Sequence, residues 1–359
     1  MRAQVVDLFC GIGGLSYGFV KEGFNVTKGI DSDELCRFAY EENVGASFIS
    51  TDVQDLVGVK ARELFSSSGG RKILIGCAPC QPFSIYAGRY RKAEKRSKKS
   101  GDSQWKLLRD FARIVKAAKP DVVSMENVPR VVRHRVFKTF VNDLEKAGYT
   151  VSHYIVRAQH YGIPQRRTRL VLFASKLGRV DLIDPTHADR PRTVRDAISH
   201  LPPIGAGSDK QDKRDRLHRS RALSEINRKR LRATKQGGSW KDWDEELLLA
   251  CHKKKKGASF RSVYGRMTWD QPSPVITTQC LGLGNGRFGH PSQTRAISIR
   301  EAALLQSFPA SFKFVPSDKP VIGVVLARQI GNAVPVRLGR AIARSIKRHL
   351  VETSRPSSA

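Results

Sequence analysis

Short apolar runs alternate with helix-like stretches through the first 175 residues of the chain. The apolar runs read AQVVDLF, VTKGID, ASFISTDV, RKILIGC, DVVSMENV, VSHYIVRA and RLVLFAS. Longer stretches such as residues 107–119 and 137–149 lie between them and place apolar residues at helical spacing. Strands and helices that alternate in this way predict an α/β fold with a doubly wound, mainly parallel sheet.

The sequence changes in character after residue 175. Residues 176–260 are polar, rich in Arg and Lys, and only weakly periodic. Regular patterns return at Ser298, which forms a predicted capping box with Glu301, and in residues 334–350, which read as a helix with Pro335 in its first turn. We therefore expect a second, smaller and irregular module between two parts of an α/β domain.

Charge points to a polyanionic partner. Lys and Arg number 64 against 33 Asp and Glu, a formal net charge of +31. A compact chain with this excess repels itself unless a polyanion is near, and nucleic acid is the natural candidate. A basic proteome or an acidic membrane surface could also explain it, but neither terminus carries an amphipathic basic helix. No run of 18 apolar residues and no signal peptide are apparent, so we expect a cytoplasmic protein without membrane association.

Residues that could bind a ligand or take part in catalysis follow five successive predicted strands. They are Asp7 and Phe9 with the turn CGIGG, then Asp31, then Asp52, then CAPCQP, and finally the triplet ENV. Ligands of doubly wound sheets bind beyond the carboxyl ends of the strands. We therefore expect the site at this edge of the sheet.

The glycine turn and two carboxylates favour a nucleoside cofactor. Asp31 follows Gly11 by 20 residues, the spacing at which an acid can hold ribose hydroxyls, and Asp52 could accept from an adenine amino group. The turn has Gly11 and Gly13 but neither the third glycine of a dinucleotide fingerprint nor the Lys of a phosphate-binding loop. S-adenosylmethionine fits this set better than a dinucleotide.

The pair Cys77 and Cys80 allows three interpretations. C-x-x-C spacing suits a redox pair, whereas the position of Cys80 between Pro79 and Pro82 suits a single nucleophile on a stiff turn. These two are about equally supported by the stretch itself. A zinc site ranks well behind because the chain has no second C-x-x-C, and we expect no metal. In the nucleophile reading, Cys77, like Cys10 and Cys36, is a buried small residue.

Eight segments together resemble the DNA cytosine-5 methyltransferase family. They are DLFCGIGG, GID, TDV, GCAPCQPFS, MENV, QHYGIPQRRTRLVLF, SIREAALLQSFP and QIGNAVP, and they occur in the family's order from residue 5 to about residue 345. The resemblance implies the fold of S-adenosylmethionine-dependent methyltransferases. It also implies a catalytic domain of residues 1–176 and 321–359 and a target-recognition domain of residues 177–320.

The resemblance also implies roles for individual residues. Cys80 matches the nucleophile that attacks cytosine C6, and Glu126 matches the group that contacts cytosine N3. Arg167 and Arg169 match the pair that binds the O2 side of the cytosine and orders the glutamate. The matching cofactor contacts are Phe9, Gly11, Gly13, Asp31, Asp52, Pro79, Leu107 and Asn332.

For DNA, the resemblance implies a target cytosine swung out of the duplex, because a thiol cannot reach C6 inside the base stack. The basic stretch after Cys80 matches a mobile loop, in which Ser84, Arg89 and Arg91 are candidate DNA contacts. Thr277 and Arg287 are candidates in the recognition module. A phosphate contact is a commoner role for a single Arg than base reading.

The implied protein is a monomeric enzyme acting on double-stranded DNA of the nucleoid, with a restriction endonuclease for the same sequence as a possible partner. A tRNA cytosine-5 methyltransferase is an alternative on the same motifs, disfavoured by the basic recognition module and by the loop sequence. A DNA-binding regulator on a retired methyltransferase fold is a second alternative. Such regulators lose the Cys or the ENV glutamate, and this chain keeps both.

Overall fold

The computed structural model describes residues 3–66, 69–79, 100–207, 212, 214–254 and 257–354. Contacts divide the chain into two compact units. Unit 1 comprises Met1–Arg157, Thr168–Pro185 and Val334–Ala359, and unit 2 comprises Ala158–Arg167 and Thr186–Ala333. These limits differ from the domain limits expected from the sequence, at residues 176 and 321. The assignment of a catalytic and a recognition role to the two parts of the chain stays a prediction.

Unit 1 contains a seven-stranded sheet with the order β3-β2-β1-β4-β5-β7-β6. β7 runs antiparallel to β5 and β6, and the other neighbours are parallel. Each of the seven apolar runs in the sequence overlaps one strand, which confirms the mainly parallel α/β sheet. The strands are β1 (Ala3–Leu8), β2 (Asn25–Asp31), β3 (Ser47–Ser50), β4 (Arg71–Gly76), β5 (Val122–Asn127), β6 (Thr150–Arg157) and β7 (Thr168–Ser175).

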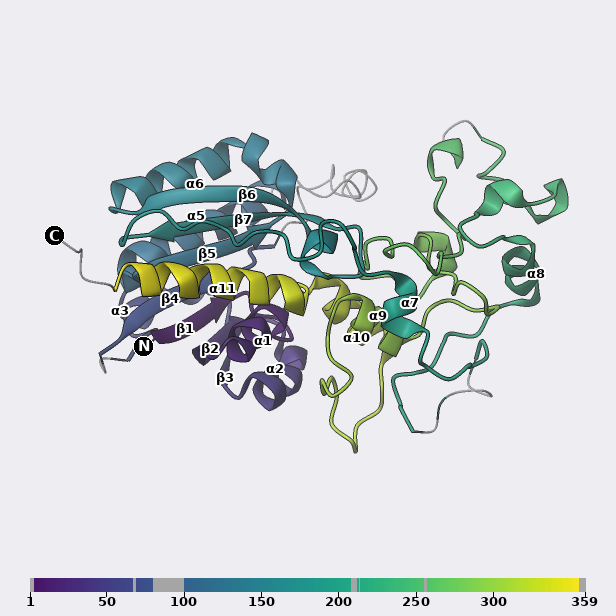
Figure 1. The fold of residues 1–359 in the computed structure, drawn as a ribbon, viewed down its shortest axis with the longest axis horizontal. Coiled ribbons are helices and arrows are strands. Elements are labelled where there is room, and N and C mark those ends of the chain that lie inside the picture. The colour runs from purple at the N-terminus through teal and green to yellow at the C-terminus, as the bar shows by residue number, and fades with distance from the viewer. Residues whose placement is uncertain are drawn as a thin grey trace. The chain divides into compact units, whose positions relative to one another are not determined.

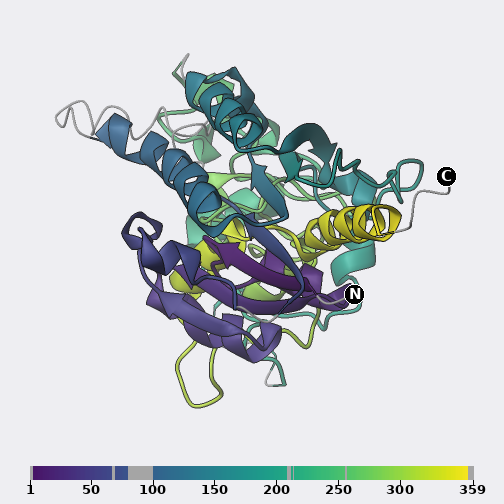
Figure 2. The same cartoon turned by 90° about the vertical axis from the view of Figure 1, so that its left-hand side faces the viewer.

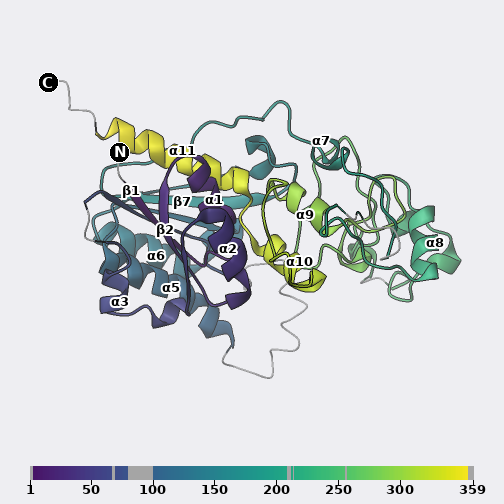
Figure 3. The same ribbon diagram turned by 90° about the horizontal axis from the view of Figure 1, so that it is seen from below.

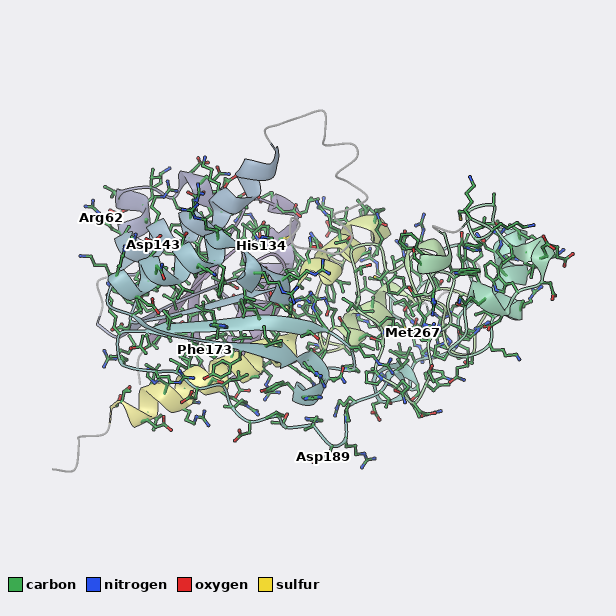
Figure 4. The ribbon with its side chains drawn as sticks, turned by 90° about the horizontal axis from the view of Figure 1, so that it is seen from above. Arg62, His134, Asp143, Phe173, Asp189 and Met267 are labelled. Carbon is green, nitrogen blue, oxygen red and sulfur yellow. The ribbon has the colours of Figure 1, made fainter. Side chains whose placement is uncertain are left out.

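Helices cover both faces of this sheet (Figure 1 and Figure 3). One face carries α3 (Val59–Arg62), α5 (Ser100–Ala118) and α6 (Arg135–Lys146), and the other carries α1 (Gly14–Lys21), α2 (Arg37–Val44) and α11 (Val336–Glu352). Figure 2 shows the N-terminal strands in purple close to α11 in yellow, so both ends of the chain build the same unit. Figure 4 shows Phe173 of β7 on the face that α11 covers.

Successive side chains of each strand point to opposite faces of the sheet, and helices cover both faces. In β1, Val6 and Leu8 join the apolar cluster beneath α5 and α6, whereas Asp7 points to the opposite face and contacts Ser16 of α1. A sheet that is covered on both sides needs apolar residues in both registers, and β5 is accordingly buried along its whole length. A polar side chain on such a strand is buried too, which matters for Asp7 and Glu126.

Unit 2 has little regular structure, and buried polar contacts join its loops in addition to apolar clusters such as that of Trp240, Trp243 and Leu247. Its helices are α7 (Val194–Ile198), α8 (Glu225–Ala233), α9 (Ile299–Leu305) and α10 (Gly323–Asn332). The guanidinium of Arg266 is buried and donates to the backbone carbonyls of Leu231, Thr234, His290 and Gln293. Satisfied buried polar groups of this kind can fix irregular loops that lack a sheet to align them.

The capping box predicted at the start of α9 is present. Ser298 Oγ accepts from the Glu301 backbone N–H at 3.0 Å, and Glu301 Oε2 accepts from the Ser298 N–H at 2.7 Å. Arg295 donates to both oxygens of the same carboxylate, and these bonds hold the pKa of buried Glu301 below its ordinary value despite the opposing effect of burial.

α10 belongs to unit 2 because its end packs closely there. The backbone of Gly331 lies so near that of Thr277 that a Cβ at residue 331 would be 2.3 Å from the Thr277 carbonyl carbon. Gln306 Nε2 also donates to the carbonyl of Ile330 at 2.6 Å. The boundary between the units therefore falls after α10 and not before it. In the part of the chain that the structure describes, no helix combines the length and apolar character needed to cross a membrane.

Candidate active site

The turn after β1 is tight and requires glycine. Phe9, Gly11 and Gly13 all have positive φ, of 58°, 50° and 85°. A Cβ on Gly13 would lie 2.8 Å from Val44 and 3.0 Å from the ring of Tyr40, whereas no atom in the described part of the chain lies within 4 Å of the Cβ position of Gly11. The turn therefore presents open space beside Gly11 at the carboxyl end of the strand.

Backbone and carboxylate contacts join the ends of β1, β2 and β3. Asp31 Oδ2 accepts from the Gly11 N–H at 2.8 Å, and the Asp31 carbonyl accepts from the Thr51 N–H at 3.1 Å. Asp31 is half-buried, and burial raises its pKa above the ordinary value for Asp. Asp52 is exposed and caps the next turn by accepting from the Gln54 N–H at 2.9 Å. The two predicted carboxylates thus follow neighbouring strands.

Asp7 adds a buried acid at this end of the sheet. Its side chain is 1 % exposed; Oδ2 accepts from Ser16 Oγ at 2.6 Å, and Oδ1 has no hydrogen-bond partner among the residues that the structure describes. Ser16 Oγ also lies 3.0 Å from the hydroxyl of Tyr40. Burial raises the pKa of Asp7 to about 7. The sequence placed Asp7 at a strand end but gave no sign of this environment.

The segment that leads to Cys80 is fixed by backbone contacts. The Cys77 N–H donates to the Leu8 carbonyl at 3.3 Å, and Asn127 Nδ2 donates to the Ala78 carbonyl at 3.1 Å. Gly76 lies so close to β1 that a Cβ there would be 2.8 Å from the Leu8 carbonyl oxygen. Pro79 is exposed. Cys80, Ser84, Arg89 and Arg91 lie outside the described residues.

Glu126 lies at the centre of a cluster from three strand ends. Its carboxyl group is buried at 2 % exposure. Arg169 Nε lies 2.9 Å from Oε1 as an ion-pair contact, and Cys77 Sγ donates to Oε2 at 2.9 Å. The antiparallel register pairs Glu126 with Val171, so the first residues of β7 reach the carboxyl end of β5. The structure therefore brings Glu126 and Arg169 together with Cys77, the first residue of the CAPC motif.

Cys77 departs from its expected setting. Cys10 and Cys36 are buried as expected, but the prediction that Cys77 is buried is wrong because it is half-exposed. Its thiol faces the carboxyl group of Glu126 because Gly76 of β4 pairs with Met125 of the parallel strand β5, which places the next residues, Cys77 and Glu126, beside each other. The C-x-x-C spacing alone could not reveal this contact.

Two other predicted cofactor contacts, Phe9 and Leu107, are half-buried in unit 1. The Phe9 ring lies edge-on to Phe111 of α5 at 6.4 Å between centroids. Leu107 belongs to the same helix.

The remaining predicted residues belong to unit 2. Arg167 is buried and donates to the Ile276 carbonyl at 3.3 Å, and Asn332 is exposed at the end of α10. Thr277 is half-buried beside Gly331. Arg287 Nη1 donates to the carbonyls of Gly237 and Gly238, and burial lowers the pKa of its guanidinium. Part of the hydrogen-bonding capacity of Arg287 is thus used within the unit.

Comparisons with known proteins give a consistent result. A family model described as C-5 cytosine-specific DNA methylase matches residues 3–348. The Type II methylase M.HgiDII of Herpetosiphon aurantiacus is 49% identical over 354 residues, which cover 98% of this chain and 96% of that protein. The Type II methyltransferase M1.HphI of Haemophilus parahaemolyticus is 30% identical, with 96% and 87% covered.

A solved structure also resembles the fold. It is an Escherichia coli DNA modification methyltransferase encoded within a prophage, and it aligns with a TM-score of 0.73 at 24% identity over 98% of this chain and 100% of that chain.

Proposed function

The chain belongs to the C-5 cytosine-specific DNA methylase family, and from this premise we propose that it methylates C5 of a flipped cytosine in a specific duplex DNA sequence through a covalent bond between Cys80 and cytosine C6. The observation that supports this most strongly is the buried carboxyl group of Glu126. It is held by Arg169 and Cys77 directly beside the segment that leads to Cys80.

Cysteine supplies the nucleophile in the proposed reaction. Cytosine C5 is a poor nucleophile, and addition of the Cys80 thiolate to C6 moves the electrons of the C5–C6 double bond toward C5. After C5 has taken the methyl group, the C5 proton leaves and the bond between sulfur and C6 breaks, which restores the aromatic ring and the free thiolate. The base must leave the duplex for this attack, because the sulfur approaches above the ring.

Glu126 donates a proton to cytosine N3 while the thiolate adds to C6. Addition at C6 places negative charge on N3 and O2, and a carboxyl group that donates to N3 stabilises this charge. The ion-pair contact to Arg169 and the hydrogen bond from Cys77 hold the two oxygens of Glu126 in a defined orientation. We propose that Arg167 and Arg169 bind the O2 side of the base.

The residues at the ends of β1 to β3 fit S-adenosylmethionine. Asp31 and Asp52 offer carboxylates for hydroxyl and amino groups, and the Gly11 turn leaves open space beside them. With Phe9 and Gly13 from the same turn, they would hold the cofactor, and we propose Pro79, Leu107 and Asn332 as further contacts. When bound, the cofactor supplies an electrophilic methyl group.

We further propose that unit 2 recognises the DNA sequence, with Thr277 at the DNA and with phosphate contacts from Ser84, Arg89 and Arg91. Arg287 is a weaker candidate than the sequence suggested, because its Nη1 donates to carbonyls of the same unit. Both named relatives are Type II methylases. A restriction endonuclease for the same site is therefore the partner that we propose, with the enzyme itself a monomer.

Methylation of two nucleic acids tests the function. The purified protein is incubated with S-adenosylmethionine and either plasmid DNA or total tRNA, and 5-methylcytosine is mapped by bisulfite conversion. We expect conversion-resistant cytosines at one sequence in the plasmid and none in the tRNA.

The Cys80→Ser variant serves as the matched control and should give no product. Methylation of tRNA alone, or full activity of Cys80→Ser on DNA, would contradict the proposal.

A further inference from the structure

We propose that Cys77 is a positioning residue for the Glu126 carboxyl group, which makes the first cysteine of CAPC a working part of the site. This inference rests on the proposed function of Glu126 and goes beyond it, because the nucleophile interpretation gives Cys77 no task of its own. Its basis is the contact of 2.9 Å between Cys77 Sγ and Glu126 Oε2.

The two oxygens of Glu126 have different neighbours. Oε1 has the charged Nε of Arg169 at 2.9 Å, and Oε2 has the thiol. The Arg169 contact to Oε1 is an ion pair without hydrogen-bond geometry, so the directional hydrogen bond from Cys77 is the contact that orients the carboxyl group about its last bond. Without the thiol, Oε2 would lose this contact at a site where the side chain is 2 % exposed and water has little access.

The sulfur is itself held in place by the backbone around it. Cys77 donates its N–H to Leu8, and the next residue, Ala78, accepts from Asn127. Glu126 and Asn127 are consecutive residues of β5, and they contact consecutive residues of the CAPC segment. The ENV triplet and the segment before Cys80 are therefore joined at two points.

A thiol suits a carboxyl group that changes its protonation state. Sulfur is a weak donor through S–H and a weak acceptor through its lone pairs. As a donor, it can hold Oε2 both when Glu126 is a carboxylate and when Oε2 is the carbonyl oxygen of the acid, which leaves the acidic proton free for cytosine N3. In the proposed reaction Glu126 gives a proton to N3 and takes one back, and Cys77 can hold Oε2 in both states. A serine hydroxyl has the same capacity, whereas an alanine methyl group has neither function.

The test compares Cys77→Ala with Cys77→Ser. Single-turnover methyl transfer and the KM values for DNA and S-adenosylmethionine are measured for each variant. We expect Cys77→Ala to lower the methyl-transfer rate roughly 10-fold, the equivalent of one lost hydrogen bond. The KM values should change by less than about twofold, since the contact acts on the reacting base and not on binding. Cys77→Ser should recover most of the rate.

Two controls separate positioning from general damage. Cys251→Ala removes an exposed thiol of unit 2 and should leave the rate unchanged. In the Glu126→Gln background, Cys77→Ala should lower the methyl-transfer rate much less than it does in wild type. The effects of two substitutions that remove the same contact are not additive. Thermal unfolding of each variant shows whether it is folded.

Equal rates for wild type, Cys77→Ala and Cys77→Ser would overturn the inference and leave the proposed function intact. So would a full effect of Cys77→Ala in the Glu126→Gln background. Inactivity of both Cys77 variants, with folded protein, would instead support an essential thiol at residue 77 and overturn positioning by hydrogen bonding. Failure of the wild-type protein to methylate DNA would contradict the proposed function itself.

Discussion

Asp7 shows how burial changes the chemistry of one residue. The strand that carries it is covered on both faces, so its side chain lies away from water, where it accepts a hydrogen bond from the Ser16 hydroxyl. Burial raises its pKa to about 7, so the folded protein keeps a proton on this group under conditions in which the unfolded chain has lost it.

This difference predicts a pH-dependent stability. The folded state binds one proton more than the unfolded state between about pH 4 and pH 7, so the contribution of Asp7 to the free energy of unfolding falls as pH rises through this window. Asp7→Asn keeps an oxygen for Ser16 and does not ionise. We expect the variant to be up to about 4 kcal/mol more stable than wild type at pH 8, with little difference at pH 4.

Urea unfolding of wild type and Asp7→Asn at pH 4, 6 and 8 measures this difference. Curves of stability against pH that run parallel for the two proteins would contradict the raised pKa of Asp7.

At the scale of elements, the contact between α1 and α11 joins the two ends of the chain. Gly18 of α1 and Gly339 of α11 face each other at close range, and a Cβ on Gly18 would lie 2.6 Å from the Gly339 carbonyl carbon. Helix backbones can approach this closely only when both positions lack side chains. The C-terminal helix is thus packed against the turn-bearing start of the chain.

Gly18→Ala should therefore destabilise unit 1. Alanine within a helix normally stabilises by about 0.5–1 kcal/mol over glycine, but here the methyl group would meet backbone atoms, so we expect a net loss of about 1–3 kcal/mol. Gly69→Ala is the control, because no described atom lies within 4 Å of its Cβ position. Chemical unfolding of both variants checks the prediction, and a Gly18→Ala protein as stable as wild type would refute it.

The elements themselves were largely predictable from the sequence, because apolar runs and helical periodicity reflect local physical chemistry. The capping box at Ser298 and the helix after Pro335 are both present. α5 was expected from residue 107 but begins at Ser100. Its start could not be predicted because the first turn is polar, contains Gly101 and shows no apolar periodicity. The strand run at residues 46–53 contains a shorter strand, because Asp52 caps the following turn.

Contacts between strand ends were not predictable in the same way. Arg169 meets Glu126 only because β7 is inserted antiparallel beside β5, and the sequence does not reveal this register. The Cys77 contact also depends on the order of β4 and β5 in the sheet. The resemblance supplied the roles of residues such as Glu126, whereas the geometry that positions them came from the structure.

At the scale of the whole molecule, the net charge of +31 should dominate DNA affinity. Binding to DNA phosphates releases counterions, and for about six contacts the affinity should fall roughly 10³-fold between 50 and 200 mM salt. Fluorescence anisotropy with a duplex of random sequence measures the slope of log affinity against log salt. A flat dependence would contradict an electrostatic role for the excess of Lys and Arg.

A substrate that cannot complete the reaction would capture the proposed transient bond between the Cys80 sulfur and the target base. Duplex DNA in which 5-fluorocytosine replaces cytosine is incubated with the protein and S-adenosylmethionine. C5 then carries fluorine in place of the proton that must leave, so the sulfur cannot be eliminated and the adduct persists. We expect a complex that survives denaturation, with the nucleotide attached to Cys80 in the digested peptide and no complex from Cys80→Ser. No stable complex, or attachment at Cys77, would contradict it.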